Sequence, residues 1–178
     1  MKDGPINRSK DRDPIVAIDV AEPCARWRES VGAIDGVCER AARAALSAAG
    51  KTWPGEAELS IVLGDDALVR SLNHRWRAQD KPTNVLSFPA QDGRSPPDAP
   101  RLLGDVVLAF ETVAAEAAAQ GKPIAHHVGH LVVHGVLHLL GFDHEAAAEA
   151  ERMEALETAV LAALGVPDPY RQAEAPHG

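Results

Sequence analysis

The chain has 178 residues, a hydrophobic share of 46% and a formal net charge of −8 at pH 7. This length is enough for one domain with a sizeable core, and the acidic balance argues against attraction of nucleic acid by the protein as a whole. We see neither a signal-peptide segment nor an apolar run long enough for a membrane span, and we expect a cytoplasmic protein.

The polar residues 1–13 predict a disordered tail and residues 171–178 a flexible C-terminal tail, which leaves 14–170 as a single domain. In chain order, β-branched and alternating patterns predict strands at 14–20, 58–63, 84–88 and 103–110. Helical patterns predict helices at 35–49, 67–73, 111–120, 123–140 and 145–164. Asp35 and Asp65 are the expected N-caps, and 90–100 is a Pro/Gly loop. This order favours an α+β or mixed-sheet domain.

Three histidines in the stretch HGVLHLLGFDH have the spacing of a metal site. His134 and His138 lie one helical turn apart on the same face, so both imidazoles can reach one ion. Gly141 can end the helix by taking a positive φ, which lets His144 turn back as a third ligand. Three imidazoles with an open fourth position are typical of a catalytic site, most often one Zn²⁺, although other divalent transition metals also bind imidazole.

The same spacing occurs in the metzincin pattern HExxHxxGxxH, where a glutamate follows the first histidine and acts as general base. Here that residue is Gly135, which cannot take a proton, so peptide hydrolysis by that route is disfavoured. One turn before His134, His130 is a support for a metal ligand, a donor that faces RNA or substrate, or simply a surface or core histidine.

Two stretches of opposite charge lie elsewhere in the chain. Around Trp76, four basic residues face one acid, Asp80, for a local balance of +3; they are Arg70, Arg75, Arg77 and Lys81. This stretch is either a solvated loop or an RNA contact, in which the indole stacks on bases and the cations hold phosphates. Six acidic residues against Arg152 predict the solvated face of the last helix; they are Asp143, Glu145, Glu149, Glu151, Glu154 and Glu157.

In four stretches between Ile61 and Tyr170 the chain resembles the YbeY family, bacterial endoribonucleases associated with the maturation of ribosomal RNA. These stretches are LNHRWRAQDKPTNVLSFP (72–89), LGDVVLA (103–109), HLVVHGVLHLLGFDH (130–144) and ERMEALETAVLAALGVPDPY (151–170). The chain departs from the family at Trp76 and Phe142, where tyrosine is more usual.

The resemblance implies a mixed four-stranded sheet packed with about five helices, with the metal site on a helix of the C-terminal half and the turn after it. It implies His134, His138 and His144 as ligands of a zinc ion and Arg77 as the arginine of RNA cleavage. It also implies action on small-subunit rRNA, together with the ribosome or ribosomal proteins. The expected function is therefore a metal-dependent, single-strand-type endoribonuclease acting in 16S rRNA 3′-end maturation and ribosome quality control.

Further roles and alternatives remain open from the sequence. Arg75, Trp76, Lys81 and His130 are candidate RNA contacts. Asp143 and Asp105 are candidates to orient a ligand histidine, and Asp143 is also a candidate turn cap. Neither the general base nor the attacking group, water or the ribose 2′-OH, is indicated. The alternatives are a metallopeptidase-like hydrolase and a non-catalytic ribosome-assembly factor with a structural metal.

Overall fold

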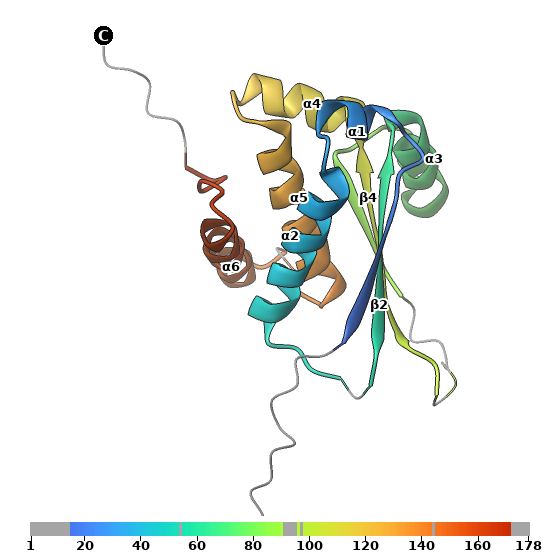
Figure 1. Ribbon diagram of the computed structural model, residues 1–178, viewed down its shortest axis with the longest axis vertical. Coiled ribbons are helices and arrows are strands. Elements are labelled where there is room, and N and C mark those ends of the chain that lie inside the picture. Colours follow the sequence, from blue (N-terminus) through green and yellow to red (C-terminus); the bar gives the residue numbers. More distant parts are fainter. Residues whose placement is uncertain (1–14, 54, 91–95, 97, 144, 172–178) are drawn as a thin grey trace, which may run out of the picture.

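The computed structural model describes residues 15–171 except 54, 91–95, 97 and 144 (Figure 1). The predicted N-terminal tail, nearly all of the C-terminal tail and His144 lie outside the described residues. The strands are β1 (Val16–Ala21), β2 (Ala57–Gly64), β3 (Val85–Pro89) and β4 (Arg101–Ala109). The helices are α1 (Arg26–Ser30), α2 (Ile34–Ala49), α3 (Asp66–Arg77), α4 (Phe110–Ala119), α5 (Ile124–Leu139) and α6 (Ala147–Ala163). Across these described ranges, no helix is both long and apolar enough to cross a membrane.

The four strands form one mixed sheet, as expected, and their order in it is β1-β2-β4-β3. β1, β2 and β4 run parallel, and β3 runs antiparallel to β4 at the edge. Five helices lie where the sequence predicts them, and the short α1 is an addition. α1 contains Trp27, which is fully buried and whose indole Nε1 donates to the carbonyl of Gly64 at 2.8 Å.

Alternate residues of β4 serve two different cores. Val106 and Leu108 belong to the main core, together with residues of α2 and α5. Val107 belongs to a smaller core on the opposite face, with Val69 of α3. This alternation is what a strand covered on both faces requires. Figure 1 shows α2 and α5 on one side of the sheet and α3 on the other, with α6 outside α2 and α5.

The two predicted N-caps, Asp65 and Asp35, lie at or near the observed helix starts. Asp65 caps α3 as predicted, because its carboxylate accepts from the backbone N–H of Leu68 at 2.9 Å. The prediction for Asp35 is wrong: α2 begins at Ile34, so Asp35 lies inside the first turn, where its charge still favours the helix dipole.

α5 ends in a Schellman motif, which has the Gly141 N–H bonded to the His138 carbonyl and the Phe142 N–H to the Leu137 carbonyl. Gly141 has a φ of +94°, which a residue with a side chain rarely adopts. The chain therefore leaves the helix sharply just after His138, as the sequence predicts.

Candidate metal centre

α5 carries the histidine stripe between the sheet and α6. His126, His130, His134 and His138 follow one another at steps of four residues, so they share one face of the helix. All four are half-buried, whereas the residues that face the sheet and α2 are fully buried. The histidines therefore lie along the margin of the core, where a side chain is held by packing and still reaches solvent.

The structure brings His134 and His138 together at one point. Their Nε2 atoms are 3.1 Å apart, and the two rings meet edge to face with centroids 4.6 Å apart. Two nitrogens that bind one tetrahedral zinc at about 2.0–2.1 Å are separated by about 3.3 Å. The spacing of the two Nε2 atoms therefore suits a shared metal ion. The third predicted ligand, His144, lies outside the described residues.

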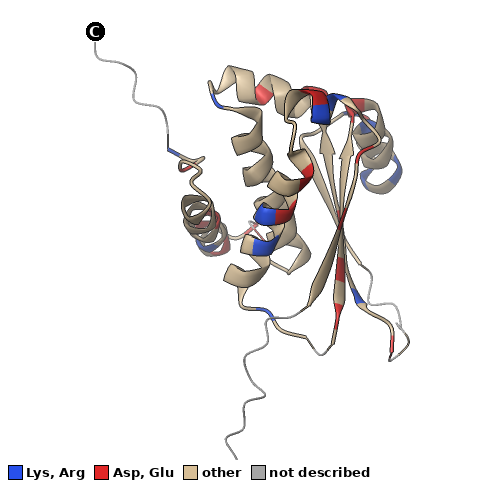
Figure 2. Cartoon of the chain, in the orientation of Figure 1, with Lys and Arg blue, Asp and Glu red and all other residues tan. Residues whose placement is uncertain are grey.

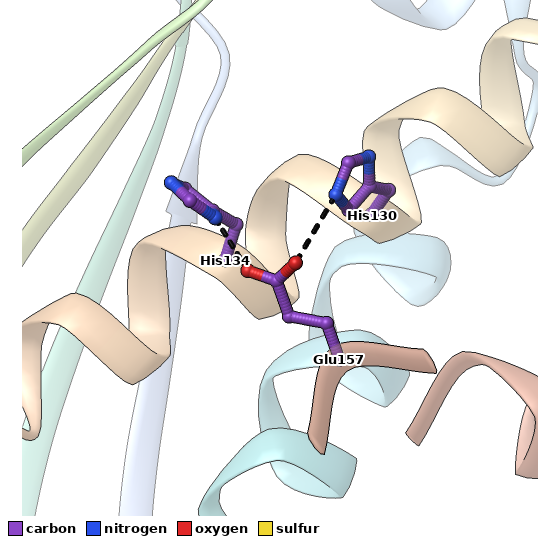
Figure 3. Close-up of side chains that lie close together, drawn as sticks. All are labelled: His130, His134 and Glu157. Carbon is purple, nitrogen blue, oxygen red and sulfur yellow. Dashed lines mark hydrogen bonds and ion pairs between the residues drawn. The ribbon is translucent and has the colours of Figure 1, made fainter. Parts of the chain in front are cut away.

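Glu157 of α6 determines which nitrogen of His134 is available. Its side chain is fully buried, and its carboxylate is hydrogen-bonded to His134 Nδ1 (Figure 3). The carboxylate also accepts from the hydroxyl of Tyr170. The second oxygen lies 3.5 Å from His130 Nε2. With its proton on Nδ1, His134 presents an unprotonated Nε2 toward His138. Carboxylates hold metal-ligating histidines in this way in many zinc sites.

The ionised form of Glu157 is strongly favoured in this setting. Burial by itself raises the pKa of a carboxyl group, but the hydrogen bonds with His130 and His134 outweigh it and lower the pKa of Glu157 to about 2. Burial, followed by the adjacent Glu157 carboxylate, raises the pKa of the Tyr170 hydroxyl. Glu157 is therefore an anion that accepts hydrogen bonds throughout the physiological pH range.

A second set of donors includes Glu157 itself. His130, His134 and Glu157 each offer one ligand atom, and these atoms lie within 4.8 Å of one another, so this group could also hold a metal ion. Because Glu157 already bonds the Nδ1 of His134, the Nε2 of His134 is the nitrogen left for an ion shared with His138. The geometry thus favours Glu157 as a support for His134.

Glu157 and Tyr170 were both missed by sequence reasoning. The sequence predicted Glu157 on the solvated face of the last helix, and the structure corrects this: Glu157 is fully buried. The signal was its position, because Met153, Glu157 and Val160 follow at spacings of four and three residues, and both neighbours are buried. A carboxylate within an apolar stripe needs a buried partner, and the partner is His134.

Gly135 permits close packing of α5 on the sheet. A Cβ atom at this position would lie 2.7 Å from Val106 Cγ1 and 3.1 Å from Ser87 Oγ. Ser87 of β3 also donates its hydroxyl to the Gly135 carbonyl at 3.0 Å. The space beside His134 is thus filled by the sheet, which leaves no room for the glutamate that metzincins carry there.

Arg77 reaches the same part of β3 from the opposite side. It is the last residue of α3, is exposed, and donates from Nη2 to the Ser87 carbonyl at 3.3 Å. Its guanidinium carbon also lies 5.9 Å from the centre of the Phe88 ring. Ser87 therefore makes two contacts: its carbonyl accepts from Arg77, and its hydroxyl donates to Gly135, the residue after His134.

The other predicted RNA contacts surround Arg77. Trp76 is 61% exposed, and the Arg75 guanidinium lies 5.2 Å from the centre of its ring. Lys81 is exposed, and its carbonyl accepts from Asn73 Nδ2 at 2.9 Å, which holds the following loop against α3. Arg70, in contrast, is paired with Asp80 at 2.7 Å. The exposed aromatic and cationic groups thus concentrate at the C-terminal end of α3.

The two aspartates proposed to orient a histidine lie in different settings. Asp143 accepts from the backbone N–H of Glu145 at 3.3 Å, which matches its alternative role as a turn cap. Asp105 is exposed on β4 and alternates with Val106, which faces the core beneath α5. The structure therefore does not bring Asp105 to the histidines of α5.

A partly buried polar network joins the segment before β3 to α4 and α5 near the stripe. Glu116 accepts from Asn84 Nδ2 at 3.1 Å and lies 2.6 Å from Nε2 of His127, which is 3% exposed. Burial lowers the pKa of His127, opposed by Glu116 and reinforced by the charges of Lys122 and His130. This network ties the segment before β3 to the helix that carries the histidines.

The chain is similar to known proteins over most of its length. Residues 28–165 match the family model described as endoribonuclease YbeY. An endoribonuclease YbeY of Paramagnetospirillum magneticum is 56% identical over 158 residues, which cover 87% of this chain and 94% of the relative. One of a Bradyrhizobium species is 50% identical over 166 residues, 90% of this chain and 95% of the relative.

A solution structure of a Thermotoga maritima protein aligns with a TM-score of 0.48 at 20% identity, over 88% of this chain and 99% of that one. The family match spans most of the chain, including α5 with its histidine stripe and the end of α3 with Arg77. The chain therefore belongs to the YbeY family, whose curated members bear the description endoribonuclease.

Proposed function

We propose that the protein is a metal-dependent endoribonuclease that cuts single-stranded RNA. The observation that carries the proposal is the link through Ser87, whose carbonyl accepts from Arg77 and whose hydroxyl donates to Gly135, beside His134. The guanidinium of Arg77 and the helix residue beside His134 thus both contact the middle of β3. The description of the relatives as endoribonucleases supports the same class of reaction.

In this proposal His134, His138 and His144 hold one ion, with zinc the metal expected for three imidazoles. Such an ion, when bound, lowers the pKa of a coordinated water and polarises a phosphoryl oxygen. Glu157 keeps the proton of His134 on Nδ1, so that Nε2 remains a ligand. Arg77 offsets the negative charge that builds on the phosphate during cleavage.

The surface around Arg77 suits a flexible RNA strand. The exposed indole of Trp76 offers a stacking face for a base, and Arg75 and Lys81 offer cations for phosphates. We further propose that the substrate is small-subunit rRNA, in 3′-end maturation and quality control of the ribosome. The relatives are described only as endoribonucleases, so the choice of rRNA substrate is part of the proposal.

A metallopeptidase is the second candidate, on the ground of the histidine spacing alone. The packing at Gly135 argues against it, because Val106 and Ser87 fill the place of a catalytic glutamate. A third candidate is an assembly factor in which the metal only fastens α5 to the turn that follows it. That role makes no use of an exposed arginine at position 77.

The test compares purified wild-type protein with Arg77→Ala and His138→Ala, and uses Arg40→Ala as the control because Arg40 is exposed on α2. Metal content, thermal stability and cleavage of labelled single-stranded RNA are measured for each. We expect His138→Ala to lose metal and activity, and Arg77→Ala to keep metal and fold while losing activity.

Three results contradict the proposal. If Arg77→Ala cleaves RNA at the wild-type rate, Arg77 has no role in catalysis. Peptide cleavage without RNA cleavage by the metal-loaded wild type favours the peptidase. Unfolding on chelation, with no cleavage of either substrate, favours the assembly factor. Mapping the 3′ end of 16S rRNA in cells that carry Arg77→Ala tests the rRNA substrate separately.

A further inference from the structure

A groove adjoins the metal centre on the side away from Arg77. It has a volume of about 1060 Å³ and lies between the turn that joins α4 to α5 and the segment that follows α6. In Figure 1 this is the region between the corner where α4 meets α5 and the red segment after α6. Lys122 and His126 line one wall, and Tyr170 and Arg171 line the other.

Two cations and one carboxylate line the groove, a balance of +1 within an acidic protein. Lys122 and Arg171 come from separate segments of the chain and line the same hollow. Asp168 is held within its own segment, since it accepts from the Tyr170 N–H at 2.9 Å and from the Thr158 hydroxyl at 3.4 Å, and its charge offsets one of the two cations. The neighbouring helices α4 and α5 contain no Lys or Arg residue (Figure 2). The cations of the groove therefore come from the segments that flank these helices, Lys122 before α5 and Arg171 after α6.

The groove and the metal centre share a wall. His130 lines the groove, and its Nε2 lies 3.5 Å from the Glu157 carboxylate that holds His134. The His130 ring also packs edge to face on Tyr170, with centroids 5.5 Å apart. Steps of four residues along α5, about 6 Å each, lead from His134 through His130 to His126 at the groove.

We propose that this groove binds the RNA chain beside the bond that is cut, with Lys122 and Arg171 on backbone phosphates. The inference rests on the proposed function and adds a substrate-binding site to it. Cations from two segments that flank a hollow suit a flexible, single-stranded polyanion, which such grooves follow along its backbone. In this proposal His126 and His130, which line the groove, face the RNA strand as it leaves the metal centre.

The double variant Lys122→Ala/Arg171→Ala tests the proposal, with Arg28→Ala/Arg40→Ala as the control, since both of those arginines are exposed outside the groove. Each phosphate contact on a single strand contributes about 0.7 to the slope of log affinity against log salt concentration. Loss of two contacts therefore lowers the slope by about 1.4 and weakens binding about tenfold at 0.15 M salt. Binding is measured by fluorescence anisotropy with a labelled single-stranded RNA.

Cleavage kinetics and metal content separate binding from structure. We expect the groove variant to raise KM about tenfold, with kcat and metal content as in the control. The charge-preserving swap Lys122→Arg/Arg171→Lys should retain wild-type affinity. If the swap loses as much affinity as the alanine variant, or if the groove variant binds RNA like the control, the proposal is wrong.

The same experiments distinguish this failure from a failure of the proposed function. A wild-type protein that carries its metal and cuts no RNA overturns the proposed function, whatever the groove variant does. A wild type that cuts RNA, with a groove variant that matches the control in KM and salt slope, overturns the groove alone.

Discussion

Replacement of Glu157 should weaken metal binding by an amount that depends on what the new side chain retains. Glu157→Gln keeps an oxygen that can accept from His134 Nδ1 but removes the negative charge. Glu157→Ala removes both, which leaves His134 free to rotate and to place its proton on Nε2. Loss of such a supporting group typically costs 10–100-fold in metal affinity. We therefore expect about tenfold for the glutamine variant and about 100-fold for alanine, or about 1.4 and 2.7 kcal/mol.

The assay is competition for Zn²⁺ with a chromophoric chelator, with Glu151→Gln as the matched control on the exposed side of α6. Thermal unfolding of the metal-free proteins is measured in parallel. A buried carboxylate opposes folding through its desolvation, while its hydrogen bonds favour folding. A variant of Glu157 can therefore lose affinity for Zn²⁺ without losing thermal stability. The visible spectrum of the Co²⁺-substituted protein reports the coordination sphere directly.

Two outcomes would refute this account of Glu157. If both variants bind Zn²⁺ within about twofold of the Glu151→Gln control, the carboxylate does not support the site. If the Co²⁺ spectrum of Glu157→Gln differs in shape from that of the wild type, Glu157 is itself a ligand, as the cluster with His130 and His134 permits. An unchanged spectrum with graded affinities is the result that the hydrogen-bond geometry predicts.

Three further predictions concern other parts of the site. Arg77→Ala should lower kcat for RNA about 100–1000-fold at unchanged metal content, as for loss of one group that stabilises transition-state charge; a drop below tenfold would contradict this. Gly135→Ala should lower the free energy of unfolding by about 1 kcal/mol, because the clash with Val106 outweighs the better helix propensity of alanine; an unchanged or higher Tm would show that the sheet yields. Because burial lowers the pKa of His127 despite Glu116, the unfolded state takes up a proton first as pH falls. The free energy of unfolding should therefore decline below about pH 6.5, and less steeply in His127→Gln; equal slopes in denaturant titrations would contradict it.

Features that depend on neighbouring residues in the chain could be predicted from the sequence. The cap of α3 by Asp65 and the end of α5 at Gly141 follow from turn and helix chemistry within a few residues. The one-turn spacing of His134 and His138 likewise needs only the helical repeat, and the structure places their Nε2 atoms 3.1 Å apart. The order of predicted elements favoured an α+β or mixed-sheet domain, but the order of the strands within the sheet was not predicted, because it is set by long-range pairing.

Features that arise between distant segments could not be predicted in this way. The burial of Glu157 depends on how α6 packs against α5, and its hydroxyl partner Tyr170 comes from the segment beyond α6. A count of acidic residues therefore placed Glu157 with the solvated ones. The start of α2 differed for a similar reason: Ile34 is fully buried, so packing draws the helix start one residue ahead of Asp35.

One glycine links the metal centre to the arginine of the proposed reaction. Because Gly135 has no side chain, α5 approaches β3 closely enough for the Ser87 hydroxyl to bond its carbonyl, while the Ser87 carbonyl accepts from Arg77. A larger residue here would collide with Val106 and move α5, with its histidines, away from β3. The lack of room for a protease-type glutamate and the bond between α5 and Ser87 thus depend on the same close packing. In the proposed reaction, Gly135 both disfavours peptide hydrolysis and joins the helix of the metal ligands to the strand that Arg77 contacts.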